Sequence, residues 1–192
     1  AIGYLVVRPA FETNYEVFNN AASLAINIGL CILLLFVGVD IGMEGTIVEN
    51  FKKVGIRIFA FPLATIVASM LAGVVCSLFM PFGVKDGLAI AAGFGWYSLA
   101  PGIIMEAGLV TTSAISFMHN VMRELFAILL IPAVAKKIGY VETTGLPGAA
   151  AMDVCLPIVE RATSADVAVY SFVSGVILSF LVPILVPIIL AL

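Results

Sequence analysis

The chain has 192 residues and a formal net charge of −3; 62% of its residues are hydrophobic and only 11% are charged. Soluble domains are typically about 45–50% apolar and about 25% charged, so this composition excludes an ordinary soluble protein and predicts an integral membrane protein. The apolar runs are long and continuous, which indicates spanning helices and not the alternating strands of a membrane barrel.

The N-terminal part of the sequence predicts one complete span. Residues 1–7 are apolar but too short to cross a bilayer, and we expect them to end a helix whose beginning precedes residue 1. A polar loop follows at 8–20, and the first full span is expected at 21–39. Asn27 in its middle is typical of a hydrogen bond between helices, and Asp40 at its end of an interfacial cap.

The next two apolar stretches differ in character. The span expected at 58–80 is almost wholly apolar and is interpreted as scaffold. The stretch 87–106 is long enough to cross, but its centre, 93–102, reads Gly-Phe-Gly-Trp-Tyr-Ser-Leu-Ala-Pro-Gly. Glycine costs about 1 kcal/mol and proline about 3 kcal/mol inside a helix, so unwound backbone is predicted at membrane depth; the alternative is close packing through small residues. Tyr97 and Ser98 are candidate ligands, or neighbours that satisfy the amides.

A chargeable face is predicted on the span at 112–135. At 100° per residue, its polar residues fall within an arc of about 140°: Ser113, Ser116, His119, Asn120, Arg123 and Glu124. Ionised groups at bilayer depth cost several kcal/mol and mark substrate or ion paths. Glu124 is the candidate coupling carboxylate, unless it is permanently paired with Arg123 or His119.

The other members of this face have less specific roles. Arg123 is expected to anchor a carboxylate or balance charge, and Asn120 to line the site. His119 is either a hydrogen-bonded packing residue or a proton relay.

A second discontinuous segment is predicted at 148–157, where small residues, Asp153 and a proline follow one another. Half-helix ends at the midplane attract ions, so Asp153 is a second candidate ligand; the alternative is a capping residue. Competition between a proton and a cationic substrate for one carboxylate is the simplest physical route to antiport. The final span is expected at 167–192.

The orientation of these segments stays open. Lys52, Lys53 and Arg57 favour a cytoplasmic first connection. If every later segment crosses, Lys136 and Lys137 lie outside, against the positive-inside rule. If one interrupted segment only re-enters, that basic pair returns to the cytoplasm.

Several motifs together resemble the lysine exporter family LysO, over nearly the whole chain. They are Leu34-Leu-Phe-Val-Gly38, Gly93-Phe-Gly-Trp-Tyr-Ser-Leu99, His119-Asn120, Arg123-Glu-Leu125, Ile131-Pro132, Ala151-Met-Asp153, Leu156-Pro157, Leu178-Ser179 and Val182-Pro183.

The resemblance implies an all-α integral membrane transporter of about six to seven transmembrane segments, two of them discontinuous. The implied fold is similar to half or more of an inverted-repeat cation/proton antiporter, with one domain over 1–192. The implied function is export of L-lysine and its analogues across the cytoplasmic membrane against protons, or alternatively sodium. Glu124 and Asp153 fall on the family's acidic positions, and no enzyme activity, cofactor or metal is implied.

Two departures from the family pattern matter. Longer members have further helices, with an additional functional acid, ahead of the region where this chain starts. A small partner subunit or a homodimer is therefore expected to supply them. Longer members also often have Asn-Asp before Arg-Glu, where this chain has His119-Asn120, which leaves the proton path and the substrate preference open.

Other classes of function are weighed against transport. An intramembrane hydrolase would use Glu124 and Asp153 as an acid–base pair, but the chain lacks Gly-x-Gly-Asp, Gly-x-Ser-x-Gly and His-Glu-x-x-His motifs. A non-transporting accessory subunit is the third class. The three cysteines match no metal-binding pattern and are interpreted as packing residues, and no basic stripe indicates a nucleic-acid partner.

Overall fold

The computed structural model describes residues 24, 28, 32, 35, 39 and 56–192 of the chain. The chain divides into two compact units, Ala1–Gly45 and Thr46–Leu192. In the first unit the five described residues are helical and exposed. Asn27, Asp40 and the rest of the expected span at 21–39 lie outside the described residues, as do Lys52 and Lys53. The expectation of one domain over 1–192 stays a prediction.

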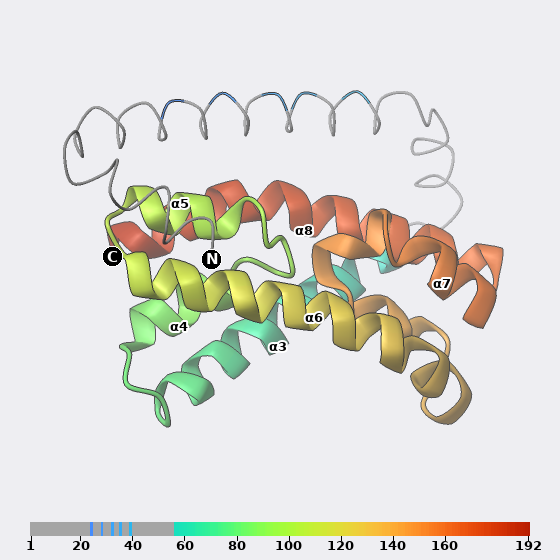
Figure 1. Ribbon diagram of the computed structural model, residues 1–192. Helices are drawn as coiled ribbons and strands as arrows, with labels where there is room; N and C mark the ends of the chain where they lie inside the picture. The colour runs from blue at the N-terminus through green and yellow to red at the C-terminus, as the bar shows by residue number, and fades with distance from the viewer. Residues whose placement is uncertain (1–23, 25–27, 29–31, 33–34, 36–38, 40–55) are drawn as a thin grey trace, which may run out of the picture. The chain divides into compact units, whose positions relative to one another are not determined.

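In the described part of the second unit, 56–192, all regular elements are helices and there is no strand (Figure 1). Its elements are η2 (Ile56–Phe59), α3 (Ala60–Ser77), α4 (Val84–Ala91), α5 (Ala100–Glu106), α6 (Val110–Lys137), η3 (Val141–Gly145), η4 (Gly148–Met152), α7 (Leu156–Ala162) and α8 (Ala165–Ala191), where η marks a short 3-10 helix. Within these residues α3, α6 and α8 are long and apolar enough to cross a membrane. They correspond to the spans expected at 58–80, 112–135 and 167–192.

Helix α8 is the centre of this unit. Half of its most apolar stretch is buried, against 22% for the same length of α3 or α6. A helix that is hydrophobic on all sides either lies in a core or faces lipid, and α8 does the first along the face that carries Ser171, Gly175 and Leu178, all buried. Helices α3 and α6 leave more of their apolar side chains exposed.

The first predicted break is confirmed between α4 and α5, where residues 92–99 are not α-helical. Helix α4 runs antiparallel to α3, and the two approach so closely that a Cβ on Gly73 would lie 2.6 Å from the carbonyl oxygen of Gly87. At the start of α4, Asp86 accepts a 3.0 Å hydrogen bond from Thr112 at the start of α6. Helix α5 returns along α6 to Glu106, so both ends of this segment lie beside the N-terminal end of α6.

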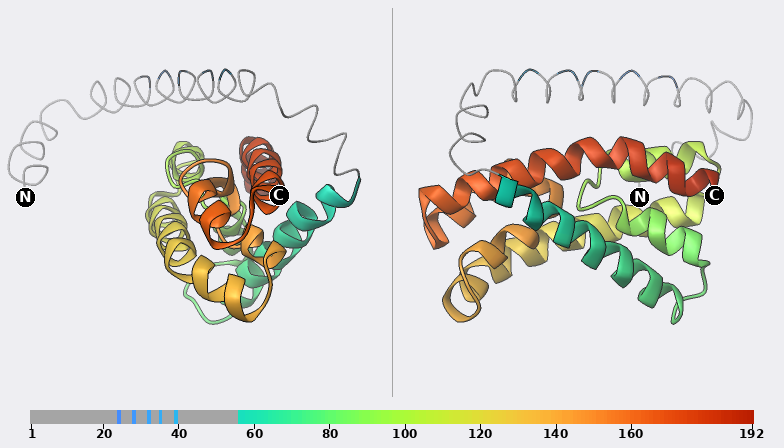
Figure 2. Two further views of the ribbon diagram at one scale, coloured as in Figure 1. Left: turned by 90° about the vertical axis from the view of Figure 1, so that its right-hand side faces the viewer. Right: turned by 180° about the vertical axis from the view of Figure 1, so that it is seen from behind.

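The second predicted break is confirmed between η4 and α7. Seen end-on, these two elements lie between α6 and α8 (Figure 2). Val159 of α7 packs in one buried cluster with Ile131 of α6 and Val167 at the start of α8. The chain therefore leaves this segment at the end where α6 finished. Each broken segment thus enters and leaves at the same end of the unit, and the two segments come from opposite ends.

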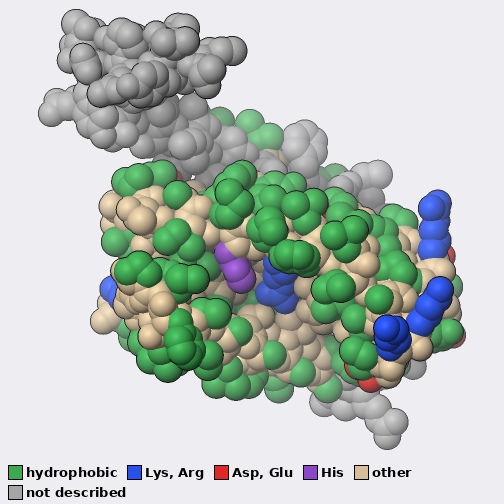
Figure 3. All heavy atoms as spheres, turned by 60° about the horizontal axis from the view of Figure 1, so that its bottom comes forward, with side chains coloured by type: hydrophobic (Ala, Val, Ile, Leu, Met, Phe, Trp, Pro, Cys, Tyr) green, Lys and Arg blue, Asp and Glu red, His purple; other side chains and the backbone are tan. Residues whose placement is uncertain are grey.

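This topology places the basic residues asymmetrically. Arg57 before α3, Lys136 and Lys137 at the end of α6, and Arg161 at the end of α7 share one end of the unit, whereas Lys85 lies at the other. Figure 3 shows most of the Lys and Arg side chains on the visible face gathered at one end. The positive-inside rule predicts that this end faces the cytoplasm, and the orientation stays a prediction.

Candidate functional site

The two broken segments cross and bind each other at the middle of the unit. The amide of Ala149 donates a 2.8 Å hydrogen bond to the carbonyl oxygen of Phe94. Gly148 and Gly95 both have positive φ, at +69° and +96°, a conformation that glycine adopts at little cost. A Cβ on Gly148 would collide with the Phe94 carbonyl, and one on Gly95 would lie 2.8 Å from the Pro147 carbonyl oxygen. Both glycines are therefore required by the crossing.

Asn120 of α6 supports the first break through a hydrogen bond with its backbone. Its Oδ1 accepts a 2.7 Å hydrogen bond from the Gly95 amide, and its Nδ2 donates to the carbonyl oxygen and hydroxyl of Ser116 at 2.8 and 3.2 Å. Asn120 and Ser116 are both fully buried. An unwound segment at membrane depth needs its amides satisfied by protein, and Asn120 does this for Gly95.

Arg123 fastens the second break to the rest of the unit. Its Nε and Nη2 donate to the carbonyl oxygens of Leu146 and Gly145 at 3.1 and 3.2 Å. Its Nη1 donates to the Ser69 hydroxyl of α3 at 3.1 Å. The interpretation of the span expected at 58–80, which is α3, as scaffold alone is therefore incomplete, because Ser69 belongs to the site. A hydroxyl in the middle of an apolar span was the signal that could have identified it.

The two acidic candidates lie near each other. Glu124 is half-buried and close enough to Asp153 for their charges to interact. Within the described part of the chain, Glu124 makes no hydrogen bond and no ion pair, with Arg123, His119 or any other residue. Asp153 is exposed and accepts a 2.5 Å hydrogen bond from the Val154 amide. Glu124 is thus a carboxylate without a permanent partner in the middle of a membrane-length helix.

The predicted polar arc of α6 is divided by the packing. Its middle, with Ser113, Ser116 and Asn120, is buried against the broken segments. One edge carries the exposed His119 and the half-buried Arg123, which line a hollow of about 570 Å³ toward α3 and α4. Figure 3 shows the histidine beside a basic side chain in a hollow bordered by hydrophobic groups. Glu124 lies on the other edge and does not line this hollow, so Arg123 and Glu124 face different sides of α6.

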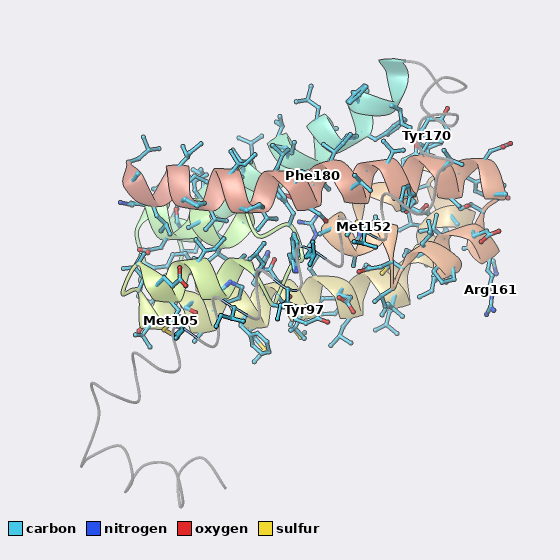
Figure 4. The ribbon with its side chains drawn as sticks, turned by 90° about the horizontal axis from the view of Figure 1, so that it is seen from above. Tyr97, Met105, Met152, Arg161, Tyr170 and Phe180 are labelled. Atoms are coloured by element: carbon cyan, nitrogen blue, oxygen red, sulfur yellow. The ribbon has the colours of Figure 1, made fainter. Side chains whose placement is uncertain are left out.

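Tyr97 and Ser98, the remaining candidates, are exposed at the first break. The Tyr97 ring packs edge-on against Phe117 of α6, with ring centroids 6.4 Å apart. Figure 4 shows Tyr97 and Met152, from the two broken segments, near the middle of the length of α6 and α8, with Met105 and Arg161 toward opposite ends. Phe117 and Glu124 are two turns apart on α6, so Tyr97 lies on the carboxylate side of the helix.

Comparisons with known proteins identify the family. The model of the lysine exporter LysO family matches residues 2–190. The chain is 30% identical over 184 residues to "Lysine exporter LysO" of Escherichia coli (strain K12), covering 96% of this chain and 61% of that protein. It is 29% identical over 172 residues to "Putative lysine exporter" of Haemophilus influenzae, covering 88% of this chain and 84% of that protein. No solved structure matches the chain. The chain belongs to the lysine exporter LysO family.

Proposed function

We propose that this chain works in a secondary transporter that exports L-lysine, and lysine analogues, across the cytoplasmic membrane in exchange for protons. The family match and the names of the two relatives support amino-acid export and favour a transporter over a hydrolase. The chain spans 61% of the length of the Escherichia coli relative. Lysine transport by this chain is therefore a proposal that needs its own measurement.

One observation carries the coupling mechanism. Glu124 is a half-buried carboxylate without a hydrogen bond or ion pair among the described residues, at mid-length of α6. A carboxylate at bilayer depth is costly unless a partner neutralises it. A proton or the ammonium group of a cationic amino acid does this equally, and one carboxylate cannot hold both at once. Alternate binding of the two is antiport, with sodium as the second candidate ion.

The other candidate residues have supporting roles in this proposal. Asp153 adds a second negative charge beside Glu124 and is accessible to a ligand. Tyr97 and Ser98, exposed at the first break, line the path by which a ligand would reach Glu124. Asn120 holds that break in place through the Gly95 amide. On the far edge of α6, His119 is placed to relay protons and Arg123 to balance charge.

The arrangement of the broken segments supports an antiporter-like fold. Segments that re-enter from opposite ends and cross at the middle are what two inverted repeats produce, with the binding site at their interface. We extend the proposal to this fold, with about six to seven transmembrane segments in all.

Enclosure of the carboxylate site requires more protein than the described residues provide. Asp153 is exposed and Glu124 only half-buried. We propose that further helices cover this side, from a second copy of the chain or from a small partner subunit. Co-purification and the mass of the detergent-solubilised complex distinguish these two sources.

The test is lysine transport in proteoliposomes under an imposed pH gradient. In the wild type, lysine is expected to move in the direction opposite to the flow of protons down their gradient. Glu124→Gln is expected to abolish this lysine flux. Glu106→Gln, an exposed acid at the end of α5, is the matched control and should retain it. Wild-type flux in Glu124→Gln would remove Glu124 from the mechanism. Absence of lysine movement by the wild type, alone and with any co-purified partner, would reject the proposed function.

A further inference from the structure

Two hollows follow the surface of α3 and meet at one point. The first, of about 470 Å³, starts at the N-terminal part of α3 and is lined by Phe61, Ala64, Thr65, Ala68, Val141 and Glu142 among others. The second, of about 570 Å³, extends to the turn after α3 and is lined by Gly73, Cys76, Met80, Pro81, Phe82 and His119 among others. Both include Ser69, Ala72 and Arg123. The hydrogen bond from Arg123 to Ser69 therefore crosses the groove where the two hollows join.

Arg123 is a cation without an anionic partner among the described residues. All three of its hydrogen bonds go to neutral oxygen atoms, those of Ser69, Gly145 and Leu146. A guanidinium group has five N–H donors, so two of them have no partner among the described residues. A charged group at membrane depth without a counter-charge is costly and marks a site for a ligand of opposite charge.

We infer that Arg123 is a carboxylate-binding site at the constriction of this groove, reached through either hollow, with the Ser69 hydroxyl occupying it when no ligand is bound. The planar donor fork of arginine matches a carboxylate in bidentate geometry. Both hollows lie in the range of about 300–1,000 Å³ that is usual for small-molecule sites. Among the described residues that line the two hollows, those near Arg123 are apolar or neutral. Glu142 is the one acid among them, and it belongs to η3 on the wall of the first hollow.

The chemistry of the groove selects one class of ligand. A cation beside apolar walls suits a small carboxylate with an aliphatic chain, and it repels a ligand that is only cationic. This inference deepens the proposed function and depends on it for the cargo: the α-carboxylate of an exported amino acid would bind here, apart from Glu124. The site on α3 would then discriminate amino acids from amines.

The test uses Cys76, which is exposed and lines the second hollow two turns along α3 from Ser69. In a full-length protein with Cys31→Ser and Cys155→Ser, the rate of Cys76 modification by a methanethiosulfonate reagent is measured in detergent. Two pairs of ligands differ only in the carboxylate: L-norleucine against pentylamine, and L-lysine against cadaverine. The carboxylate member of each pair is expected to protect Cys76 at a concentration about 10- to 100-fold lower than its amine.

Variants locate the effect at the constriction. Arg123→Lys keeps the charge but loses the fork, and should raise the protecting concentration of L-norleucine about tenfold. Ser69→Ala removes only the neutral acceptor, so L-norleucine should protect Cys76 in this variant at the same or a lower concentration than in the wild type. Ala72→Phe places a large ring where the two hollows join and should abolish protection of Cys76 by L-norleucine. This variant tests the site if Arg123→Lys does not fold.

The outcomes separate this inference from the proposed function. Equal protection by both members of each pair, or no protection by any of the four compounds, overturns the carboxylate site, whatever the flux of Glu124→Gln. Carboxylate-selective protection that Ala72→Phe removes supports the site, even in a protein that moves no lysine.

Discussion

The amide of Ala149 and the carbonyl oxygen of Phe94, 2.8 Å apart, join two breaks that are more than fifty residues apart in the chain. Hydrocarbon offers no hydrogen bonds, so unwound backbone at membrane depth must be satisfied by protein or by a wet cavity. Here each break satisfies part of the other, and Asn120 and Ser171 satisfy further groups from α6 and α8. Neither broken segment is therefore an independent unit of structure.

The crossing predicts a severe effect of a single methyl group at Gly148. In Gly148→Ala the new Cβ collides with the Phe94 carbonyl, and alanine at φ +69° adds a backbone cost of about 1–2 kcal/mol. We expect a loss of more than about 3 kcal/mol of stability, seen as a lower unfolding temperature of the purified protein in detergent.

Gly108 provides the matched control. Its φ is +80°, but a Cβ there meets nothing within 4 Å, so Gly108→Ala carries only the backbone cost of about 1–2 kcal/mol. Equal losses in the two variants would show that the Gly148–Phe94 approach is not a tight constraint.

Asn120 is expected to act on stability more than on affinity. Asn120→Ala leaves the buried Gly95 amide without its 2.7 Å acceptor, which costs about 1–3 kcal/mol. Ser116→Ala removes only the longer, 3.2 Å contact with Asn120 and should cost less. Thermal unfolding and lysine binding measured on the same samples check this. A large loss of affinity at unchanged unfolding temperature would instead make Asn120 a direct ligand.

Two serines one turn apart on α8 make a further pair. Ser171 donates a 2.9 Å hydrogen bond to the Ala151 carbonyl of η4, whereas the buried Ser174 hydroxyl has no partner within the described residues. Ser171→Ala should therefore cost about 1 kcal/mol, and Ser174→Ala should be neutral or slightly stabilising. Chemical or thermal unfolding of both variants measures the difference, and a larger loss at Ser174 would contradict the assignment.

The re-entrant topology predicts which residues face each side. Glu106→Cys should react with an impermeant maleimide added to intact cells, and Lys137→Cys only after the membrane is opened, because the positive-inside rule predicts that the basic end faces the cytoplasm. Both residues are exposed at opposite ends of the unit. Labelling of both from one side would mean that α6 does not cross. The reverse pattern would invert the proposed orientation.

The sequence predicted the elements well because their signals are local. Long apolar runs predict α3, α6 and α8, and the glycines and proline of 93–102 predict unwound backbone, since each acts through its own backbone preferences. The acidic candidates Glu124 and Asp153 were chosen for the same kind of local reason, because a carboxylate inside an apolar span stands out in composition alone, and their roles stay predictions. The contacts of these residues depend on distant segments and were not predictable in this way.

By itself, the sequence determined a helical membrane protein with two interrupted segments and a chargeable face on α6. Only the tertiary structure decided that both interrupted segments re-enter, that they bind each other at Phe94 and Ala149, and that Arg123 turns away from Glu124 toward Ser69. Periodicity along a helix fixes which side chains share a face. Which helix covers that face is set by packing between residues far apart in the chain, and here that packing separates the cation from the carboxylate.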